Sequence, residues 1–296
     1  MRRSAATWLV AAVVATATVV AASSAARAAG EAARTGFPPP PQDSPATVWA
    51  VGDGADGSDL SKSVSDMIEA RDPDRFLYLG DVYHNGTMSE FENNYDPVYG
   101  RFNSIAAPTP GNHDWGNRAV GYRPYWSDAT GERIPSWYWV KAGRWQILSL
   151  NSEAAHGPRS KQVRWLRKRL RNSEAFGNCR IAFFHHPRYS AGASHGDERH
   201  VEPFWDALAG HARIVLGGHD HDMQRFQRRR GMIQFVSGAG GYSMRAVDED
   251  DPRLAFAEDF VAGALRLELR PRRADHEFVS ADGTVLDSGS LKCKRG

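Results

Sequence analysis

Two histidines separated by a single residue, His219 and His221, follow a short apolar segment at 214–216 and two glycines. In an extended segment, side chains two residues apart point the same way, so both imidazoles can face one centre. Imidazole nitrogen binds zinc, iron, copper and nickel. The pair therefore indicates a metal site, with Asp220 as the spacer, although two histidines of a surface loop would give the same pattern.

Four more apolar segments end in the same way, in a polar ligand-type residue flanked by glycine or proline. An aspartate after a strand usually caps a helix or a turn, so each junction alone is weak evidence. The carboxyl ends of strands in an α/β sheet meet at one edge, so the five junctions together predict a shared site. Its side chains are Asp53, Asp81, Asn112, His185, and the pair His219 and His221.

The number and type of these donors predict two metal ions. Six side chains are too many for one zinc ion and suit two ions that share a carboxylate. Mixed oxygen and nitrogen donors favour iron, zinc or manganese over calcium or a thiolate-bound metal. Two ions about 4 Å apart can activate water and bind a phosphoryl group.

The elements that must position these residues alternate between strand and helix first and are mostly strands later. This order predicts two packed sheets flanked by helices in one domain. Predicted helices lie at 63–70, 88–99, 201–208 and in the segment that Ser160 caps. Predicted strands are 47–51, 75–79, 104–108, 137–140, 145–150, 180–184, 213–216, 232–236, 262–269, 276–280 and 284–286.

The first 28 residues have the pattern of a secretory signal peptide. A basic start is followed by an apolar run and an Ala-x-Ala sequence at 26–28. An uncleaved membrane anchor is the alternative, because the apolar run is close to the length that spans a bilayer. A proline-rich linker at 29–46 would then precede a domain at 47–296.

Cleavage after Ala28 would remove three arginines and no acid, which changes the formal net charge from +2 to −1. Because the net charge of the mature chain would be close to zero, it does not indicate binding to nucleic acid or to a membrane. In an exported protein the two cysteines, Cys179 and Cys293, can pair, with two free thiols as the alternative. We expect a secreted, periplasmic or extracellular protein, and its oligomeric state stays open.

The calcineurin-like metallophosphoesterases have an ordered signature of five short blocks, and this chain resembles it in all five. The resemblance covers about 47–240 and implies an α/β fold, a four-layer α/β/β/α sandwich with a dinuclear metal site that hydrolyses phosphate esters. The blocks are Gly52-Asp53, Gly80-Asp81, Gly111-Asn112-His113-Asp114, His185-His186-Pro187 and Gly218-His219-Asp220-His221.

The resemblance also implies roles for individual residues. His113 would lie beside the phosphate and stabilise or protonate the leaving oxygen. His185 is preferred to His186 as a ligand because the family's histidine lies two residues before the proline. Asp53 and His221 would bind one metal, Asp81 would bridge both metals, and Asn112, His185 and His219 would bind the second.

One departure from the family pattern points to a branch of it. Many relatives have Asp-x-His in the first block, whereas here the sequence is Asp53-Gly54-Ala55. Purple acid phosphatases also lack that histidine and use a tyrosine three residues after the bridging aspartate. Here His84 is at that position and Tyr83 is one residue earlier, so Tyr83 is a ligand, His84 replaces it, or neither binds metal.

The chain therefore is most similar to purple acid phosphatases and their bacterial relatives. The position of His195, ten residues after His185, fits a phosphate-side histidine of that branch, with a solvated loop histidine as the alternative. The resemblance implies iron paired with iron, zinc or manganese, and hydrolysis of small phosphomonoesters by a metal-bridging hydroxide. A phosphodiesterase or nucleotidase, a non-catalytic secreted binding protein and a one-metal structural protein are the alternatives.

Overall fold

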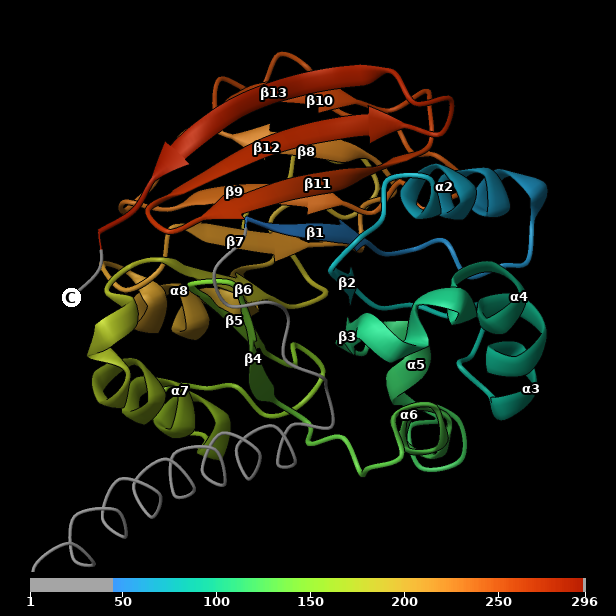
Figure 1. Cartoon of the computed structure of the whole chain (residues 1–296), viewed down its shortest axis with the longest axis horizontal. Coiled ribbons are helices and arrows are strands. Elements are labelled where there is room, and N and C mark those ends of the chain that lie inside the picture. Colours follow the sequence, from blue (N-terminus) through green and yellow to red (C-terminus); the bar gives the residue numbers. More distant parts are fainter. Residues whose placement is uncertain (1–44, 295–296) are drawn as a thin grey trace, which may run out of the picture.

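A computed structural model of the chain describes residues 45–294. The predicted signal peptide, and the linker except for its last two residues, therefore lie outside the described residues. Within them, two β-sheets pack face to face and helices lie on the outer sides (Figure 1). None of the helices in this part of the chain is both long enough and apolar enough to cross a bilayer.

The first sheet has the strand order β13-β12-β11-β1-β2-β3. Neighbours β1, β2 and β3 run parallel, so their carboxyl ends lie at the same edge. The remaining three strands continue the sheet in antiparallel register. The strands are β1 (Ala46–Val51), β2 (Arg75–Tyr78), β3 (Ala106–Pro108), β11 (Gly263–Arg270), β12 (Arg273–Ser280) and β13 (Val285–Lys292).

The second sheet has the order β10-β8-β9-β7-β6-β5-β4, and its centre is parallel. Side chains alternate across β6 as a strand requires. Ile181 and Phe183 face the core between the sheets, whereas Ala182 packs against the outer helices. The strands are β4 (Tyr138–Ala142), β5 (Trp145–Ser149), β6 (Arg180–Phe183), β7 (Ile214–Gly217), β8 (Met223–Phe226), β9 (Ile233–Ser237) and β10 (Leu254–Glu258).

The helices form the two outer layers. Helices α7 and α8 cover the second sheet with an apolar cluster that includes Val163, Leu166 and Trp205. Helix α2 contacts β11 on the other side of the molecule (Figure 1). The helices are α2 (Asp59–Glu69), α3 (Met88–Glu90), α4 (Asp96–Tyr99), α5 (Asn112–Trp115), α6 (Tyr122–Thr130), α7 (Lys161–Asn172) and α8 (Glu202–Leu208), with short turns η1 (Phe91–Tyr95), η2 (Gly100–Ile105), η3 (Glu174–Phe176) and η4 (Arg199–Val201).

The predicted two-sheet sandwich with outer helices is confirmed, but several elements differ from the sequence prediction. The helix predicted at 88–99 contains a π-helical segment, η1, between α3 and α4. The first half of the strand predicted at 104–108 belongs to the 3₁₀ turn η2. The structure also contains β8, β10, α5 and α6, which the sequence analysis did not predict.

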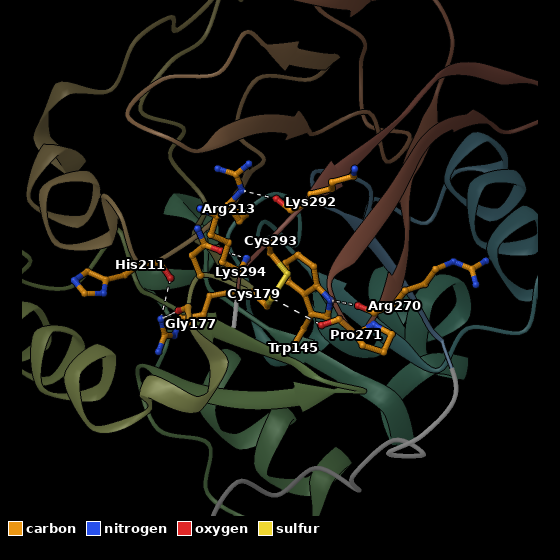
Figure 2. The surroundings of a disulfide bond; sticks show 12 residues. Trp145, Gly177, Cys179, His211, Arg213, Arg270, Pro271, Lys292, Cys293 and Lys294 are labelled. Atoms are coloured by element: carbon orange, nitrogen blue, oxygen red, sulfur yellow. Dashed lines mark hydrogen bonds between the residues drawn. A yellow bond between two sulfur atoms is a disulfide. The ribbon is translucent and has the colours of Figure 1, made fainter. Parts of the chain in front are cut away.

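The predicted pairing of Cys179 and Cys293 is confirmed by a disulfide between these residues (Figure 2). Cys179 comes directly before β6, and Cys293 follows β13, so the bond joins the two sheets. Beside it, the backbone N–H of Asn178 donates to the carbonyl of Lys294 at 2.7 Å. In return, the N–H of Lys294 donates to Oδ1 of Asn178 at 2.6 Å. Lys294, the last of the described residues, is therefore held at the amino end of β6.

Candidate metal centre

The predicted site residues lie at the carboxyl ends of five parallel strands, where the two sheets meet. Asp53, Asp81 and Asn112 follow strands of the first sheet, and His185 and His219 follow strands of the second. Ligand-type atoms of Asp53, Asp81 and His185 all lie within 4.8 Å of one another. Residues from both sheets therefore meet in one buried cluster, as the shared-edge argument predicts.

The backbone is held in a left-handed conformation at three of these positions. The φ angles are 59° at Asp53, 67° at Asp81 and 71° at His219. Residues other than glycine adopt this region at a cost, and such conformations concentrate at functional sites. Gly111 allows a further close approach, because a Cβ there would lie 2.0 Å from Oδ1 of Asp81. Local backbone geometry thus brings these side chains together.

His185 is the centre of one half of the cluster. Its Nε2 atom lies 3.3 Å from Oδ2 of Asp81, 3.0 Å from Oδ1 of Asn112 and 3.2 Å from Nδ1 of His219. Its Nδ1 atom lies 2.9 Å from the carbonyl oxygen of Leu79, which can only accept, so the ring hydrogen is on Nδ1. In a neutral His185, Nε2 therefore directs a lone pair at the acceptor oxygens of Asp81 and Asn112.

This arrangement of acceptors fits a cation. His185 is fully buried. Burial by itself would lower the pKa of His185, but the carboxylates of Asp81 and Asp53 raise it well above its usual value. Buried lone pairs that face one another require a positive charge between them, supplied by a proton or by a metal ion. The residues at the site thus suit the metal that their types predict.

Tyr83 and His221 form the other half of the cluster with Asp53. The phenol oxygen of Tyr83 lies 3.1 Å from Oδ1 of Asp53 and 3.0 Å from Nε2 of His221. Nδ1 of His221 lies 2.9 Å from the carbonyl of Ser243, so this ring also turns Nε2 toward the cluster. Metal-binding histidines usually donate their other N–H to a backbone carbonyl in this way.

Of the two neighbours Tyr83 and His84, Tyr83 points into this group. The Tyr83 side chain is buried, whereas His84 is exposed. The carbonyl of His84 accepts from Nδ1 of His113 at 2.6 Å. Burial, and then the charge of Asp53, raise the pKa of Tyr83 well above its usual value. The phenol thus keeps its proton unless a cation displaces it.

The two histidines predicted beside the phosphate lie on the solvent side of the cluster. The side chain of His113 is 36% exposed, and its Nε2 lies 3.8 Å from Oδ2 of Asp81. The side chain of His195 is 37% exposed, and its ring stacks on that of His219 with centroids 4.0 Å apart. An anion that reaches the cluster from solvent would therefore meet both imidazoles.

Three residues support the cluster although the sequence analysis gave them no role of their own. Asp114 is buried and accepts backbone N–H groups of Gly111, Asp81 and Val82 at 2.8–2.9 Å. The ring of Tyr242 stacks on Tyr83 with centroids 3.8 Å apart. Asp220, expected to be only a spacer, contacts His195. Asp114 and Asp220 could have been singled out from the sequence, because each is adjacent to a ligand-type histidine. No sequence pattern singles out Tyr242.

The fold and the site together define an α/β sandwich with a buried cluster of metal-binding side chains between its sheets. Residues 46–223 match the calcineurin-like phosphoesterase family, and the chain belongs to it.

Similar proteins include a purple acid phosphatase of Glycine max, which is 26% identical over 219 residues. That match covers 65% of this chain and 47% of the relative, and the chain spans less than half the length of the curated relatives it matches.

Two solved structures share the fold. Purple acid phosphatase PPD1 of Lupinus luteus has a TM-score of 0.70 at 18% identity, over 87% of this chain and 55% of that chain. GAP50, the anchor in the inner membrane complex of Plasmodium, has a TM-score of 0.68 at 17% identity, over 86% and 90% of the two chains.

Proposed function

We propose that this protein is a metal-dependent phosphatase that hydrolyses phosphomonoesters at the seam between its two sheets. One observation carries the proposal: a buried group of facing lone pairs surrounds His185 Nε2, and two members of this group, Asp81 and His219, are contacted by the partly exposed imidazoles of His113 and His195. The first feature suits cations and the second suits a phosphate. The family and the similarity to purple acid phosphatases support the same activity.

Two metal ions suit the number of donors in the two halves of the cluster. When bound, they would supply an activated water and stabilise charge on the phosphoryl oxygens. Iron paired with iron, zinc or manganese is the proposed pair, because Tyr83 suits a ferric ion and the other donors are nitrogen and oxygen. Asp53, Tyr83 and His221 would hold one ion, Asn112, His185 and His219 would hold the other, and Asp81 would contribute to both.

The chain's own residues act on the substrate from the solvent side. Nδ1 of His113 donates to the carbonyl of His84, which fixes the ring and leaves Nε2 to face the substrate. A protonated His113 can then give its Nε2 proton to the leaving oxygen as a general acid. Asp220 raises the pKa of His195, so the His195 cation is available to hold a phosphate oxygen.

Export is part of the proposal. Disulfides persist in oxidising compartments and are rare where thiols are kept reduced. The Cys179–Cys293 bond therefore supports a secreted or periplasmic protein, as does the pattern at residues 1–28. Edman sequencing of the protein recovered from its natural host tests this: a mature chain that begins at Ala29 is expected, and intact residues 1–28 in the cytosolic fraction would refute it.

The activity is tested with metal-loaded protein on p-nitrophenyl phosphate, bis-p-nitrophenyl phosphate and nucleotides. We expect the monoester to be the best substrate. Asp81→Asn removes the shared carboxylate and should lower kcat/KM at least about 100-fold, because it disturbs both metals. Asp66→Asn, on the exposed side of α2, is the matched control and should leave kcat/KM within about 2-fold.

Each other outcome assigns a different function. Preference for the diester or for nucleotides would replace the monoesterase with a phosphodiesterase or nucleotidase. Two bound metals without turnover on any substrate would make the protein a binding protein, and one metal per chain would exclude the two-metal site.

A further inference from the structure

Helix α7 carries a row of positive charge that the proposed phosphatase activity does not use. Residues 159–171 contain no acid, although the whole chain has a formal net charge of only +2. Positive charge is therefore concentrated on this part of the surface. Six exposed cations lie on the helix or just before it, and we call them the basic ridge: Arg159, Lys161, Arg164, Arg167, Lys168 and Arg171.

The basic ridge follows from the amphipathic pattern of α7. The helix lies on the outer side of the second sheet and buries Val163, Leu166 and Leu170 there (Figure 1). One stripe of its exposed side consists of Lys161, Arg164, Lys168 and Arg171. Successive members of the stripe are three or four positions apart and so are neighbours on the helix surface. At a rise of about 1.5 Å per residue, the stripe extends over about 15 Å.

The charges of the basic ridge are not neutralised by the described part of the chain. Among residues 45–294, none of the six cations forms an ion pair. Nη1 of Arg164 donates to the carbonyl of Arg159, and Nη1 of Arg167 donates to the carbonyl of Pro158 at 2.9 Å. These bonds hold two guanidinium groups over the start of the helix. Each group keeps further N–H donors for an acceptor outside the chain.

This arrangement of charge opposes the stability of α7. Arg164 lies four positions before Lys168, and like charges at this spacing destabilise a helix. Arg167 and Arg171 have the same spacing. Lys161 lies in the first turn, which contains no acid, although the helix dipole favours negative charge there. An anion bound along the basic ridge would relieve both effects.

Positive charge continues past the end of α7 into a surface hollow of about 460 Å³. Its charged and titratable lining residues are Arg171, Glu174, Arg180, His211 and Lys294. Figure 2 shows His211 and Lys294 in the surroundings of the disulfide. Arg180 is buried, and burial, followed by the charge of Arg169, lowers its pKa to about 10. Because a nearby cation opposes the charge of Arg180, the potential at this end of the ridge is also positive.

We propose that the basic ridge binds a linear chain of phosphates of the inorganic polyphosphate type. Guanidinium groups bind phosphate oxygens through paired N–H donors, and four of the six ridge residues are arginines. Residues 159–172 expose no large apolar or aromatic side chain. The ridge therefore offers nothing on which bases could stack and nothing to insert into lipid. Closely spaced phosphates suit it better than a nucleic acid or a membrane surface.

The experiment measures the binding of fluorescently labelled inorganic polyphosphate to the full-length protein, by anisotropy, over a range of NaCl concentrations. In Arg164→Gln/Lys168→Gln we expect Kd to rise about 10-fold at low salt. The slope of log Kd against log[NaCl] should fall by about 1–2, because two phosphate contacts are lost. Lys62→Gln/Arg133→Gln removes the same charge from α2 and from the loop after α6, and should change neither value.

A second variant, Arg167→Gln/Arg171→Gln, should weaken binding to the same extent. Circular dichroism checks that the variants are folded, and both should keep kcat/KM on p-nitrophenyl phosphate within about 2-fold of the wild type. Asp81→Asn, which should lose phosphatase activity, should still bind polyphosphate. Binding is read without turnover, so a failed phosphatase assay and a failed polyphosphate site are distinguishable.

Several results would overturn the proposal. One is a wild-type protein that does not bind polyphosphate at low salt, and another is an equal Kd in the wild type and both ridge variants. An equal loss in Lys62→Gln/Arg133→Gln would show that only net charge matters. Loss of binding in Asp81→Asn would assign the polyphosphate to the metal centre. Tighter binding of single-stranded DNA, or of phosphatidylglycerol vesicles, would replace the phosphate chain with a nucleic acid or a membrane.

Discussion

Asp220 holds the imidazole of His195 over the metal centre: Oδ1 of Asp220 lies 3.2 Å from Nδ1 of His195. Asp220 is fully buried, whereas His195 reaches solvent. The hydrogen bond with this carboxylate raises the pKa of His195. The residue between the two histidines of the His219–His221 pair thus controls the charge of a third histidine on the substrate side.

Asp220→Asn should weaken substrate binding in a pH-dependent way. Without the carboxylate the pKa of His195 falls, so the cation that holds phosphate is lost at a lower pH. As the pH is raised, we expect KM to begin to rise at a lower pH in the variant than in the wild type. In the pH range where His195 is protonated in the wild type but not in the variant, kcat/KM of the variant should be about 10-fold lower. Measurement of KM against pH on p-nitrophenyl phosphate checks this.

The matched control for that variant is Asp222→Asn. Asp222 is also buried, and burial, followed by the charge of Asp220, raises its pKa well above its usual value. Asp222 accepts from Gln224 at 2.9 Å. We expect the same KM profile as in the wild type. If Asp220→Asn also leaves the profile unchanged, His195 does not bind the phosphate as a cation.

Tyr83→Phe should remove the colour of the iron-loaded protein. A phenolate bound to ferric iron has a visible charge-transfer band, and binding requires the metal ion to displace the phenol proton of Tyr83, which is released to solvent. Tyr242→Phe is the control, because the ring of Tyr242 stacks on Tyr83 while its oxygen lies 3.4 Å from Nδ1 of His84. Absorption spectra of the two iron-loaded variants and the wild type show whether the band depends on Tyr83. A band that survives in Tyr83→Phe would remove Tyr83 from the proposed ligands.

The position of the centre could be predicted from sequence because it depends on local pattern. An apolar strand followed by glycine and a ligand-type residue marks each junction, and parallel strands place their carboxyl ends together. Asp53, Asp81, Asn112, His185 and His219 were all brought together in this way. The core strands β1, β2 and β6 were predicted for the same reason, since each is a continuous buried run.

The remaining parts depend on contacts between distant segments. Tyr83 meets Tyr242, which is 159 positions away, and His186 meets His200 only because the loop between them folds back. Strand β8 has no long apolar run, and β10 is half-exposed, so neither has the pattern of a buried strand. Helix α6 has a proline, Pro124, near its start, which argues against a helix in the sequence, although proline is tolerated in the first turn.

Removal of the disulfide should lower stability without loss of activity. Cys179 and Cys293 are 114 positions apart, so their bond restricts a long loop in the unfolded chain. Replacement of both by alanine should lower the free energy of unfolding by about 2–5 kcal/mol. Urea unfolding measures this. We expect kcat/KM within about 2-fold of the wild type, because Cys179 and His185 lie at opposite ends of β6; a large loss of activity would contradict that separation.

His276 should make the protein less stable in acid. It is buried in β12, and burial, followed by the charge of Arg225, lowers its pKa to about 4. The unfolded chain has a pKa near 6.5 here, so it binds the proton first. The stability that neutral His276 contributes is present above pH 6.5 and is lost as the pH falls toward 4.

His276→Leu should remove this part of the acid sensitivity. Between pH 7 and pH 4.5, the wild type should lose about 2 kcal/mol more unfolding free energy than the variant. Asp287, 3.7 Å from Nε2 of His276, already pairs with Arg225 at 2.7 and 2.8 Å and is therefore a weak partner for a His276 cation. Urea unfolding at the two pH values gives the comparison, and parallel losses in both proteins would show that His276 is protonated while folded.

Strand β6 is joined to the opposite sheet at both of its ends. Cys179 precedes the strand and is bonded to Cys293, and His185 follows it and donates to the carbonyl of Leu79. A metal bound between Asp81 and Nε2 of His185 would add a coordination bond to this second attachment. The two sheets should then unfold as a single cooperative unit. Reduction of the disulfide together with chelation of the metal would uncouple them, so that one half of the molecule could melt while the other stays folded.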